Sequence, residues 1–267
     1  MKVGLMGFGK TGKAVASVLL ESKKVNLQWV LRQSTRLEHR SVPEFLGVDS
    51  DEPGLIYSTG EYDAETLLEK HPVDFIVDFS SEQGVDYYAD AAARRGVSII
   101  SAVSSYPDAQ VKLLEEKARQ TAVLHSPNIT LGINFLMMAS RVLQNIAPYT
   151  DIEIVEEHFK RKPEVSGTAR KIAGSLGIEP SAIKTIRAGG IIGVHEVIFG
   201  FPYQVVRLRH ESISREAFGN GIIFALENML GKEKGLYTME DLLLPYFQIS
   251  PAIAADISQQ KPWWRFW

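Results

Sequence analysis

The stretch KVGLMGFGKTGKAV (residues 2–15) decides how the first half of this chain folds. Its apolar start predicts a strand, and a G-x-G-x-x-G pattern then leads into a helix over residues 11–21. In such a loop one glycine permits the tight turn, one admits a pyrophosphate, and one lets helix and strand pack closely. The helix N-terminus adds amide donors for phosphates. The alternative is a plain glycine turn, but the context favours a dinucleotide site made by Gly7, Phe8, Gly9, Lys10, Thr11 and Gly12.

The next apolar run, NLQWVLR (26–32), bears on the choice of cofactor. An NAD enzyme normally ends this strand with an acid that holds the ribose 2′-hydroxyl. Here no acid precedes Glu38, whereas Arg32 and Arg36, with Lys10, are suited to a 2′-phosphate. We therefore expect NADPH, with NADH use possible, against the alternative of a solvated loop with two arginines.

Strands and helices alternate through the first 130 residues. Nearly continuous apolar runs separated by helices predict a parallel sheet covered on both faces, which is an α/β, Rossmann-type domain. Further strands are expected at residues 73–79, 97–103 and 122–126, and helices at 64–70, 83–95 and 108–120.

The second half has a different pattern. After a helix at about 134–147 come strands at 151–159, 191–200 and 203–212, of which the last two alternate with period two, as in a sheet with one wet face. A long helix follows at 215–230. We expect a dinucleotide-binding domain at 1–128, an α+β substrate-binding and oligomerisation domain at 129–214, residues 215–243 packed back on the first domain, and an aromatic extension at 244–267.

The totals exclude several classes of protein. The chain has 267 residues, 45% of them hydrophobic, a net charge of −3 and no cysteine. These values argue against a nucleic-acid binder, a disulfide-stabilised protein and a thiolate metal site, and we expect no metal. The N-terminus lacks a signal-peptide pattern, and no apolar run approaches the roughly 20 residues of a membrane helix. We expect a soluble, cytoplasmic protein.

The segment EEHFKRKPEVSGTA (156–169) holds the candidate chemistry. His158 ends a predicted strand and titrates near neutrality. Ser166, Gly167 and Thr168 predict a helix cap whose amides and hydroxyls suit a carboxylate or a phosphate. Lys162, four residues before that cap, adds a cation. Each of these features alone has an equally good alternative explanation: a surface histidine, a solvated lysine and a simple helix cap.

Several motifs together resemble the dihydrodipicolinate reductase family over about residues 1–243. The segment 158–169 is similar to the family's His-His, lysine and Ser-Gly-Thr-Ala motif, and VDFIVDFS (73–80) to its Asp-Phe-Ser/Thr strand end. Other similar segments are SPNITLGINFLM (126–137), IRAGGIIGVHEVIF (186–199), HESISREAFGNGIIFA (210–225) and GKEKGLYTMEDLL (231–243).

The resemblance implies a reductase of the diaminopimelate and lysine pathway, which binds a nicotinamide cofactor on one domain and a cyclic dicarboxylate on the other. By position, His158 matches the family's acid/base histidine and Lys162 its catalytic lysine, and Arg215 stands near the substrate. Ser166, Gly167 and Thr168 match the carboxylate-binding turn. The family's tetramer forms through C-terminal sheets, so a homo-oligomer, tetramer or dimer, is implied. The remaining implied cofactor contacts are Phe79, Ser80, Ser101, Ser104, Ser126 and Asn128.

Three departures from the family pattern lie at the reacting end. Phe159 replaces the second histidine, which removes a hydrogen bond to substrate worth about 1–3 kcal/mol. Glu164-Val165 makes the next segment one residue shorter. SAVSS (101–105) stands where the family has Gly-Thr-Thr-Gly beside the nicotinamide, and its side chains would crowd the ring.

These departures leave three hypotheses open. The first is the lysine-pathway reductase, and the second is a paralogous NAD(P)H-dependent reductase of another cyclic imine or enamine acid. The third is a dinucleotide-binding regulator without catalysis, against which His158 and Lys162 weigh. The extension adds a cluster of Trp263, Trp264, Phe266 and Trp267, for which we expect packing on the protein or, alternatively, a lid.

Overall fold

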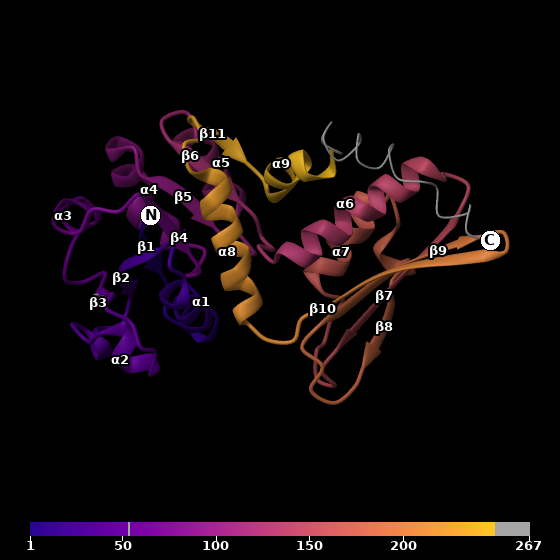
Figure 1. The fold of residues 1–267 in the computed structure, drawn as a ribbon, viewed down its shortest axis with the longest axis horizontal. Helices are drawn as coiled ribbons and strands as arrows, with labels where there is room; N and C mark the ends of the chain where they lie inside the picture. The colour runs from indigo at the N-terminus through magenta and orange to yellow at the C-terminus, as the bar shows by residue number, and fades with distance from the viewer. Residues whose placement is uncertain (53, 249–267) are drawn as a thin grey trace, which may run out of the picture.

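The protein has two parts, each built on its own sheet (Figure 1). The structure, a computed structural model, describes residues 1–52 and 54–248. The first sheet has seven strands in the order β11-β6-β5-β4-β1-β2-β3, and all its neighbours pair in parallel. The strands are β1 (Lys2–Met6), β2 (Asn26–Arg32), β3 (Leu55–Ser58), β4 (Phe75–Asp78), β5 (Ser98–Ser101), β6 (Ala122–His125) and β11 (Gly235–Tyr237).

Helices cover both faces of this sheet, as its apolar strands require. Each face has its own buried cluster, one around Leu5 and Val30 and the other around Trp29 and Ile76. The first cluster is closed by α1 (Lys10–Glu21), α2 (Val42–Leu46), α8 (Glu216–Met229) and α9 (Met239–Leu243). The second is closed by α3 (Ala64–Lys70), α4 (Gly84–Arg95) and α5 (Asp108–Lys117).

The strand order reverses between β1 and β4, which places a crevice at the carboxyl ends of these two strands. The glycine loop lies there for steric reasons. Gly7 has a φ of +93°, and a Cβ on it would meet the Phe79 carbonyl oxygen at 2.6 Å. A Cβ on Gly12 would lie 2.1 Å from the Gly7 oxygen. The α/β, Rossmann-type fold predicted from this loop is confirmed.

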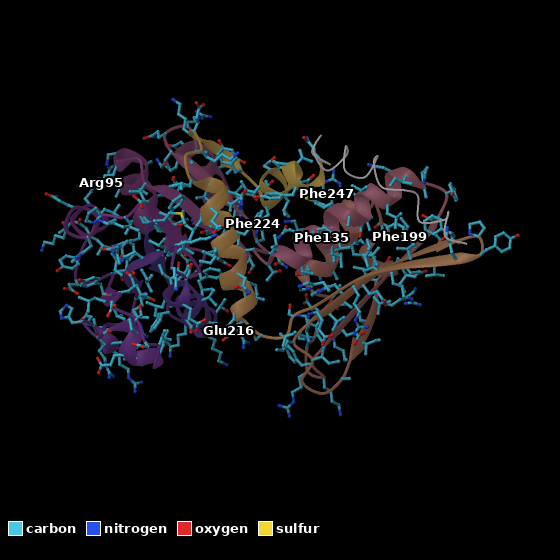
Figure 2. The ribbon with its side chains drawn as sticks, viewed as in Figure 1. Arg95, Phe135, Phe199, Glu216, Phe224 and Phe247 are labelled. Carbon is cyan, nitrogen blue, oxygen red and sulfur yellow. The ribbon has the colours of Figure 1, made fainter. Side chains whose placement is uncertain are left out.

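The second part is a mixed sheet in the order β10-β9-β7-β8, with α6 (Leu131–Ile146) and α7 (Gly167–Ser175) packed on one face. Phe199, labelled in Figure 2, is fully buried in the core that this packing forms. The strands are β7 (Asp151–His158), β8 (Lys184–Arg187), β9 (Val194–Phe201) and β10 (Gln204–Glu211), and short 3₁₀ turns lie at η1 (Thr35–Leu37), η2 (Pro180–Ala182) and η3 (Leu244–Phe247).

Alternation along β7 sorts its side chains between the two faces. Ile154, Glu156 and His158 are buried on the helix-covered face, while Glu153 and Glu157 lie on the other. Two charged or titratable side chains therefore enter the interior of this part at the end of one strand.

The chain returns to the first part after β10. Helix α8 packs against α1 so closely that a Cβ on Gly219 would lie 2.5 Å from Cβ of Val18. Strand β11 then adds to the edge of the parallel sheet beside β6. The segment expected to pack back from about residue 215 thus supplies both a helix and a strand.

The aromatic extension is described only at its start. In η3, Phe247 lies against Phe135 of α6 with ring centroids 5.5 Å apart (Figure 2). Tyr246 lies 5.6 Å from Phe224 of α8. The tryptophan cluster expected at residues 263–267 lies outside the described residues.

Within residues 1–52 and 54–248, no helix combines the length and apolar character needed to cross a bilayer. The cytoplasmic location stays a prediction.

Candidate active site

A groove made of three cavities lies along the crevice and reaches the second part. Its first cavity, of about 680 Å³, is lined by the glycine loop and by Arg32. A second, of about 540 Å³, shares Ser80 and Ser81 with the first. A third, of about 250 Å³, shares Asn128 and Thr168 with the second and ends at His158. Each cavity therefore adjoins the next along the crevice.

The first two cavities contain most of the predicted cofactor residues. Gly7, Phe8, Gly9, Arg32 and Ser80 line the first, and Thr11, Phe79, Ser80, Ser104 and Asn128 line the second. Gly9 has open space where a Cβ would stand, as a backbone that admits a phosphate requires. The amino end of α1 opens on the same space, so its free amides suit an anion.

The other predicted cofactor residues lie outside these cavities. Lys10 and Arg36 are exposed, and Gly12 is buried beneath the loop. Ser126 is buried and donates its hydroxyl to the Asn128 carbonyl at 2.6 Å. Ser101 is fully buried, and its hydroxyl lies 2.8 Å from that of Tyr106. Of the two serines expected to crowd the nicotinamide, only Ser104 therefore faces the cavity.

A buried network below the second cavity explains where Ser101 points. Asp78 ends β4, is fully buried, and accepts hydrogen bonds from the Ser80 amide and hydroxyl. Its other oxygen accepts from Tyr88 at 2.9 Å and from Tyr106 at 3.1 Å. Tyr106 thus ties Ser101, at the end of β5, to the end of β4. Burial raises the pKa of Asp78, although the hydrogen bonds oppose this shift.

The third cavity brings together residues from both ends of the C-terminal half. His158 of β7, His195 of β9, and Arg215, which precedes α8, line it with Thr168 of α7. Thr168 accepts a hydrogen bond from Asn128 at 3.1 Å, so the two parts of the molecule meet at the site. The predicted histidine and two of the predicted substrate residues are therefore adjacent.

The remaining predicted substrate residues do not line this cavity. Ser166 is buried, and its hydroxyl caps α7 by accepting from the Ala169 amide at 3.0 Å. Gly167 is exposed beside it. Lys162 is half-buried, and its carbonyl accepts from Arg187 at 3.1 Å. Its charge nevertheless contributes to lowering the pKa of His158.

Three functional candidates were missed by the sequence reasoning: Glu156, Arg187 and His195. The fully buried Glu156 carboxylate accepts from Arg187 at 2.6 Å and from the Ser166 amide at 3.1 Å. The His195 imidazole is buried 5.4 Å from that of His158, centroid to centroid. Period-two alternation in β7 was the available signal for Glu156, but the partners come from other strands.

Burial lowers the pKa of both histidines. For His158 the nearby Glu156 carboxylate opposes this shift, whereas Lys162 and Arg187 add to it. Burial, assisted by His158, lowers the pKa of His195 to about 4. Burial alone would raise the pKa of Glu156, but the hydrogen bonds from Ser166 and Arg187 outweigh it, and that pKa is lowered.

The cluster also has the atom types of a metal site. Ligand atoms of Glu156, His158 and His195 lie within 4.8 Å of one another. However, both carboxylate oxygens already accept hydrogen bonds, one of them from a guanidinium. A cation would compete with Arg187, so the chemistry of this set fits a hydrogen-bonded ion pair better than a metal ion.

Comparisons with known proteins agree with this architecture. Residues 1–129 match the family model described as "Dihydrodipicolinate reductase, N-terminus" and residues 128–243 the model for its C-terminus. A 4-hydroxy-tetrahydrodipicolinate reductase of Caldanaerobacter subterraneus is 32% identical over 65% of this chain and 78% of its own. One from Thermosipho africanus is 29% identical over 69% of this chain and 85% of its own.

Solved structures share the fold. A dipicolinate-bound dihydrodipicolinate reductase from Paenisporosarcina superposes with a TM-score of 0.72 at 20% identity, covering 90% of this chain and 98% of that one. An amine dehydrogenase from Mycobacterium smegmatis gives 0.60 at 11% identity, covering 91% and 95%.

Proposed function

The chain belongs to the dihydrodipicolinate reductase family, and on that premise we propose that it reduces 4-hydroxy-tetrahydrodipicolinate to tetrahydrodipicolinate with a nicotinamide cofactor. The observation that carries the proposal is the series of three cavities from Arg32 to His158, in which neighbouring cavities share lining residues. It offers a phosphate-binding loop at one end and a histidine-lined cavity at the other. Family membership makes the chain an NAD(P)H-dependent oxidoreductase.

The residues of the first two cavities suit a nicotinamide dinucleotide. The glycine loop and the amino end of α1 would hold the pyrophosphate, and Phe79, Ser80 and Ser104 would surround the nicotinamide. When bound, this cofactor supplies the reducing equivalents, and the protein supplies binding, orientation and electrostatics.

NADPH is the proposed cofactor. Arg32 lines the first cavity, and among the described residues it forms no ion pair that would occupy its guanidinium. Glu38 is the first acid after β2, and it accepts a hydrogen bond from Ser58. Arg32→Ala should therefore raise the KM for NADPH and leave the KM for NADH nearly unchanged. An equal rise for both cofactors would contradict a 2′-phosphate contact.

At the other end, His158 is the proposed proton donor and Lys162 the proposed cation beside the substrate. Arg215 and Thr168 line the same cavity and would bind a carboxylate. A dicarboxylate in this cavity would favour the protonated imidazole, because its negative charge offsets the nearby Lys162 and Arg187.

Phe159 favours a second candidate, a paralogous reductase of another cyclic imine or enamine acid. Its side chain is 43% exposed and does not line the third cavity, so nothing at this position replaces the hydrogen bond of the family's second histidine. A substrate with one hydrogen-bond acceptor fewer at that position would bind here without leaving an acceptor unsatisfied.

Steady-state assays separate these candidates. The purified full chain, mixed with NADPH and freshly generated dihydrodipicolinate, should oxidise the cofactor rapidly. Tight NADPH binding with no turnover would point to the paralogous substrate or to a regulator. His158→Ala and Lys162→Ala should each lower kcat by about 10²–10⁴-fold, the usual contribution of acid–base catalysis, and should spare NADPH affinity. Unchanged kcat in both variants would overturn these roles.

A homo-oligomer is also proposed, built through the outer face of the C-terminal sheet. That face carries the ion pairs Arg209–Glu157 and Arg207–Glu196, and both described helices of this part lie on the opposite face. Light scattering of the full chain should give a dimer or a tetramer, and a monomer at assay concentration would contradict this.

A further inference from the structure

We propose that Glu156 is a positioning residue, whose buried carboxylate holds the His158 imidazole with its Nε2 toward the substrate and stabilises the imidazolium. The inference rests on the proposed function, because it assigns His158 the role of proton donor. It concerns a residue that does not line the substrate cavity.

The donors around Glu156 fix its carboxylate in place. Glu156 is fully buried, and one oxygen accepts from Arg187 at 2.6 Å while the other accepts from the Ser166 amide at 3.1 Å. Arg187 also donates to the carbonyl groups of Lys162 and Glu164, so its guanidinium is fixed in turn. These donors keep the carboxylate ionised in a dry site.

The two ring nitrogens of His158 have different neighbours. Nδ1 of His158 lies 3.2 Å from a Glu156 oxygen, whereas a Cβ built on Gly193 would lie 3.1 Å from Nε2. Gly193 and His158 both line the third cavity, so Nε2 lies beside a cavity-lining residue while Nδ1 lies beside Glu156. The Nδ1 contact is within ion-pair range but is not aligned as a formed hydrogen bond. Catalytic hydrogen bonds are often loose without substrate and tighten in the complex.

The neighbouring imidazole, that of His195, is also held by a hydrogen bond. The Ser166 oxygen accepts from the Ala169 amide and also lies 3.0 Å from Nε2 of His195, with which it shares one hydrogen bond. Nδ1 of His195 is buried without a partner in the described chain. Ser166 therefore joins the Glu156 carboxylate, through its amide, to His195, through its hydroxyl.

Among the residues that the structure describes, Glu156 supplies the one negative charge that opposes the positive ones around His158. Facing it are Glu156 on its own strand, Lys162 in the following loop, Arg187 on β8 and the imidazole of His195 on β9. His210 on β10 contributes to lowering the pKa of His195, and Arg215 lines the same cavity. Without the Glu156 charge, burial and the nearby cations would both oppose protonation of His158, and no described charge would favour it.

Glu156→Gln tests the proposal in the full chain, since it keeps the shape and removes the charge. Loss of the carboxylate lowers the pKa of His158, so the pH at which kcat falls as the acid form is lost should move downward. We expect kcat at neutral pH to drop at least about 10-fold, within the range that acid–base catalysis contributes, with an unchanged KM for NADPH. Glu65→Gln is the control, because Glu65 is also a carboxylate paired with arginines but lies on α3 of the first part. Its pH profile should equal that of the wild type.

NMR of the imidazole nitrogens gives a readout that needs no turnover. In the wild type, neutral His158 should carry its proton on Nδ1, and this preference should weaken in Glu156→Gln. A wild-type Nε2–H tautomer would overturn the proposal even if the variant failed to fold, and so would an unshifted pH profile in a folded variant. Absence of wild-type turnover with dihydrodipicolinate, combined with the Nδ1–H tautomer, would overturn the proposed substrate and leave the role of Glu156 standing.

Discussion

Each part of the molecule buries one carboxylate near the carboxyl end of a strand, and the two are stabilised in opposite ways. Asp78 of the parallel sheet accepts only from hydroxyls and an amide. Glu156 of the mixed sheet accepts from an amide and from a guanidinium. Both side chains have no exposed surface. The pKa of Asp78 is raised by burial, whereas that of Glu156 is lowered by its hydrogen bonds and its cationic partner.

The difference separates a structural role from an electrostatic one. Four neutral hydrogen bonds satisfy Asp78 and fix two strand ends beside the cofactor groove, for which a negative charge is unnecessary. Glu156 is kept ionised at considerable desolvation cost, and such a charge is useful where a proton is handled. Asp78 accepts more hydrogen bonds than Glu156, so it is the cation beside Glu156, and not the number of hydrogen bonds, that keeps a carboxylate ionised here.

The largest effect is expected when the cation is removed from Glu156. Arg187→Met should lower the free energy of unfolding by about 3–5 kcal/mol, because it leaves a buried carboxylate unpaired. Arg94→Met is the control at an exposed pair of the first part, where loss of the pair with Glu65 should cost at most about 1 kcal/mol. Urea unfolding of both variants measures the difference, and equal losses would show that burial of Glu156 does not matter.

Removal of the other carboxylate should rank second. Asp78→Ala leaves the Tyr88 and Tyr106 hydroxyls and the Ser80 amide without their acceptor. Each unsatisfied buried donor costs about 1–3 kcal/mol, and partial rehydration should limit the total to about 3 kcal/mol. A loss below about 1 kcal/mol in urea unfolding would mean that water replaces the carboxylate.

The two sites should respond to pH with opposite signs. The folded-state pKa of Glu156 lies below its ordinary value of 4.5, so its stabilising contribution is present above that pH and is lost as pH falls. The folded-state pKa of Asp78 lies above 3.8, so its contribution is largest below that pH and declines as pH rises.

Replacing each carboxylate by its isosteric amide measures the sign of its pH-dependent contribution to stability. The range from about pH 4 to about pH 7 starts near the two ordinary pKa values. Over this range the stability deficit of Glu156→Gln should grow with pH, and that of Asp78→Asn should shrink. Each is obtained from urea unfolding of the variant and the wild type at matched pH. Parallel trends would contradict the contrast between the two carboxylates.

The smallest effect is expected at the edge of the Asp78 network. Tyr106→Phe removes the hydrogen bonds to Asp78 and Ser101 but keeps the ring against His125. A loss of about 1 kcal/mol in stability should accompany a severalfold rise in the KM for NADPH with little change in kcat. An unchanged KM would show that Tyr106 does not hold the loop of residues 101–105 in place.

Local patterns were sufficient for most of the fold. The expected helix at residues 11–21 corresponds to α1 (Lys10–Glu21), and the strand at 26–32 to β2 without any shift. Strands β3, β8 and β11 were missed. They have three or four residues each, which is too short for a periodic pattern, and their place is set by the neighbouring strands with which they pair.

The sequence by itself determined the glycine loop, the parallel sheet and the positions of His158 and Arg32, because these depend on residues close together in the chain. Only the tertiary structure decided that Ser101 turns into the core and that Glu156, Arg187 and His195 meet behind His158. These residues come from three different strands. Their pairing depends on sheet register and on which face each strand buries, and so does the charge at the site, because burial and a cation from another strand set the pKa of a carboxylate together.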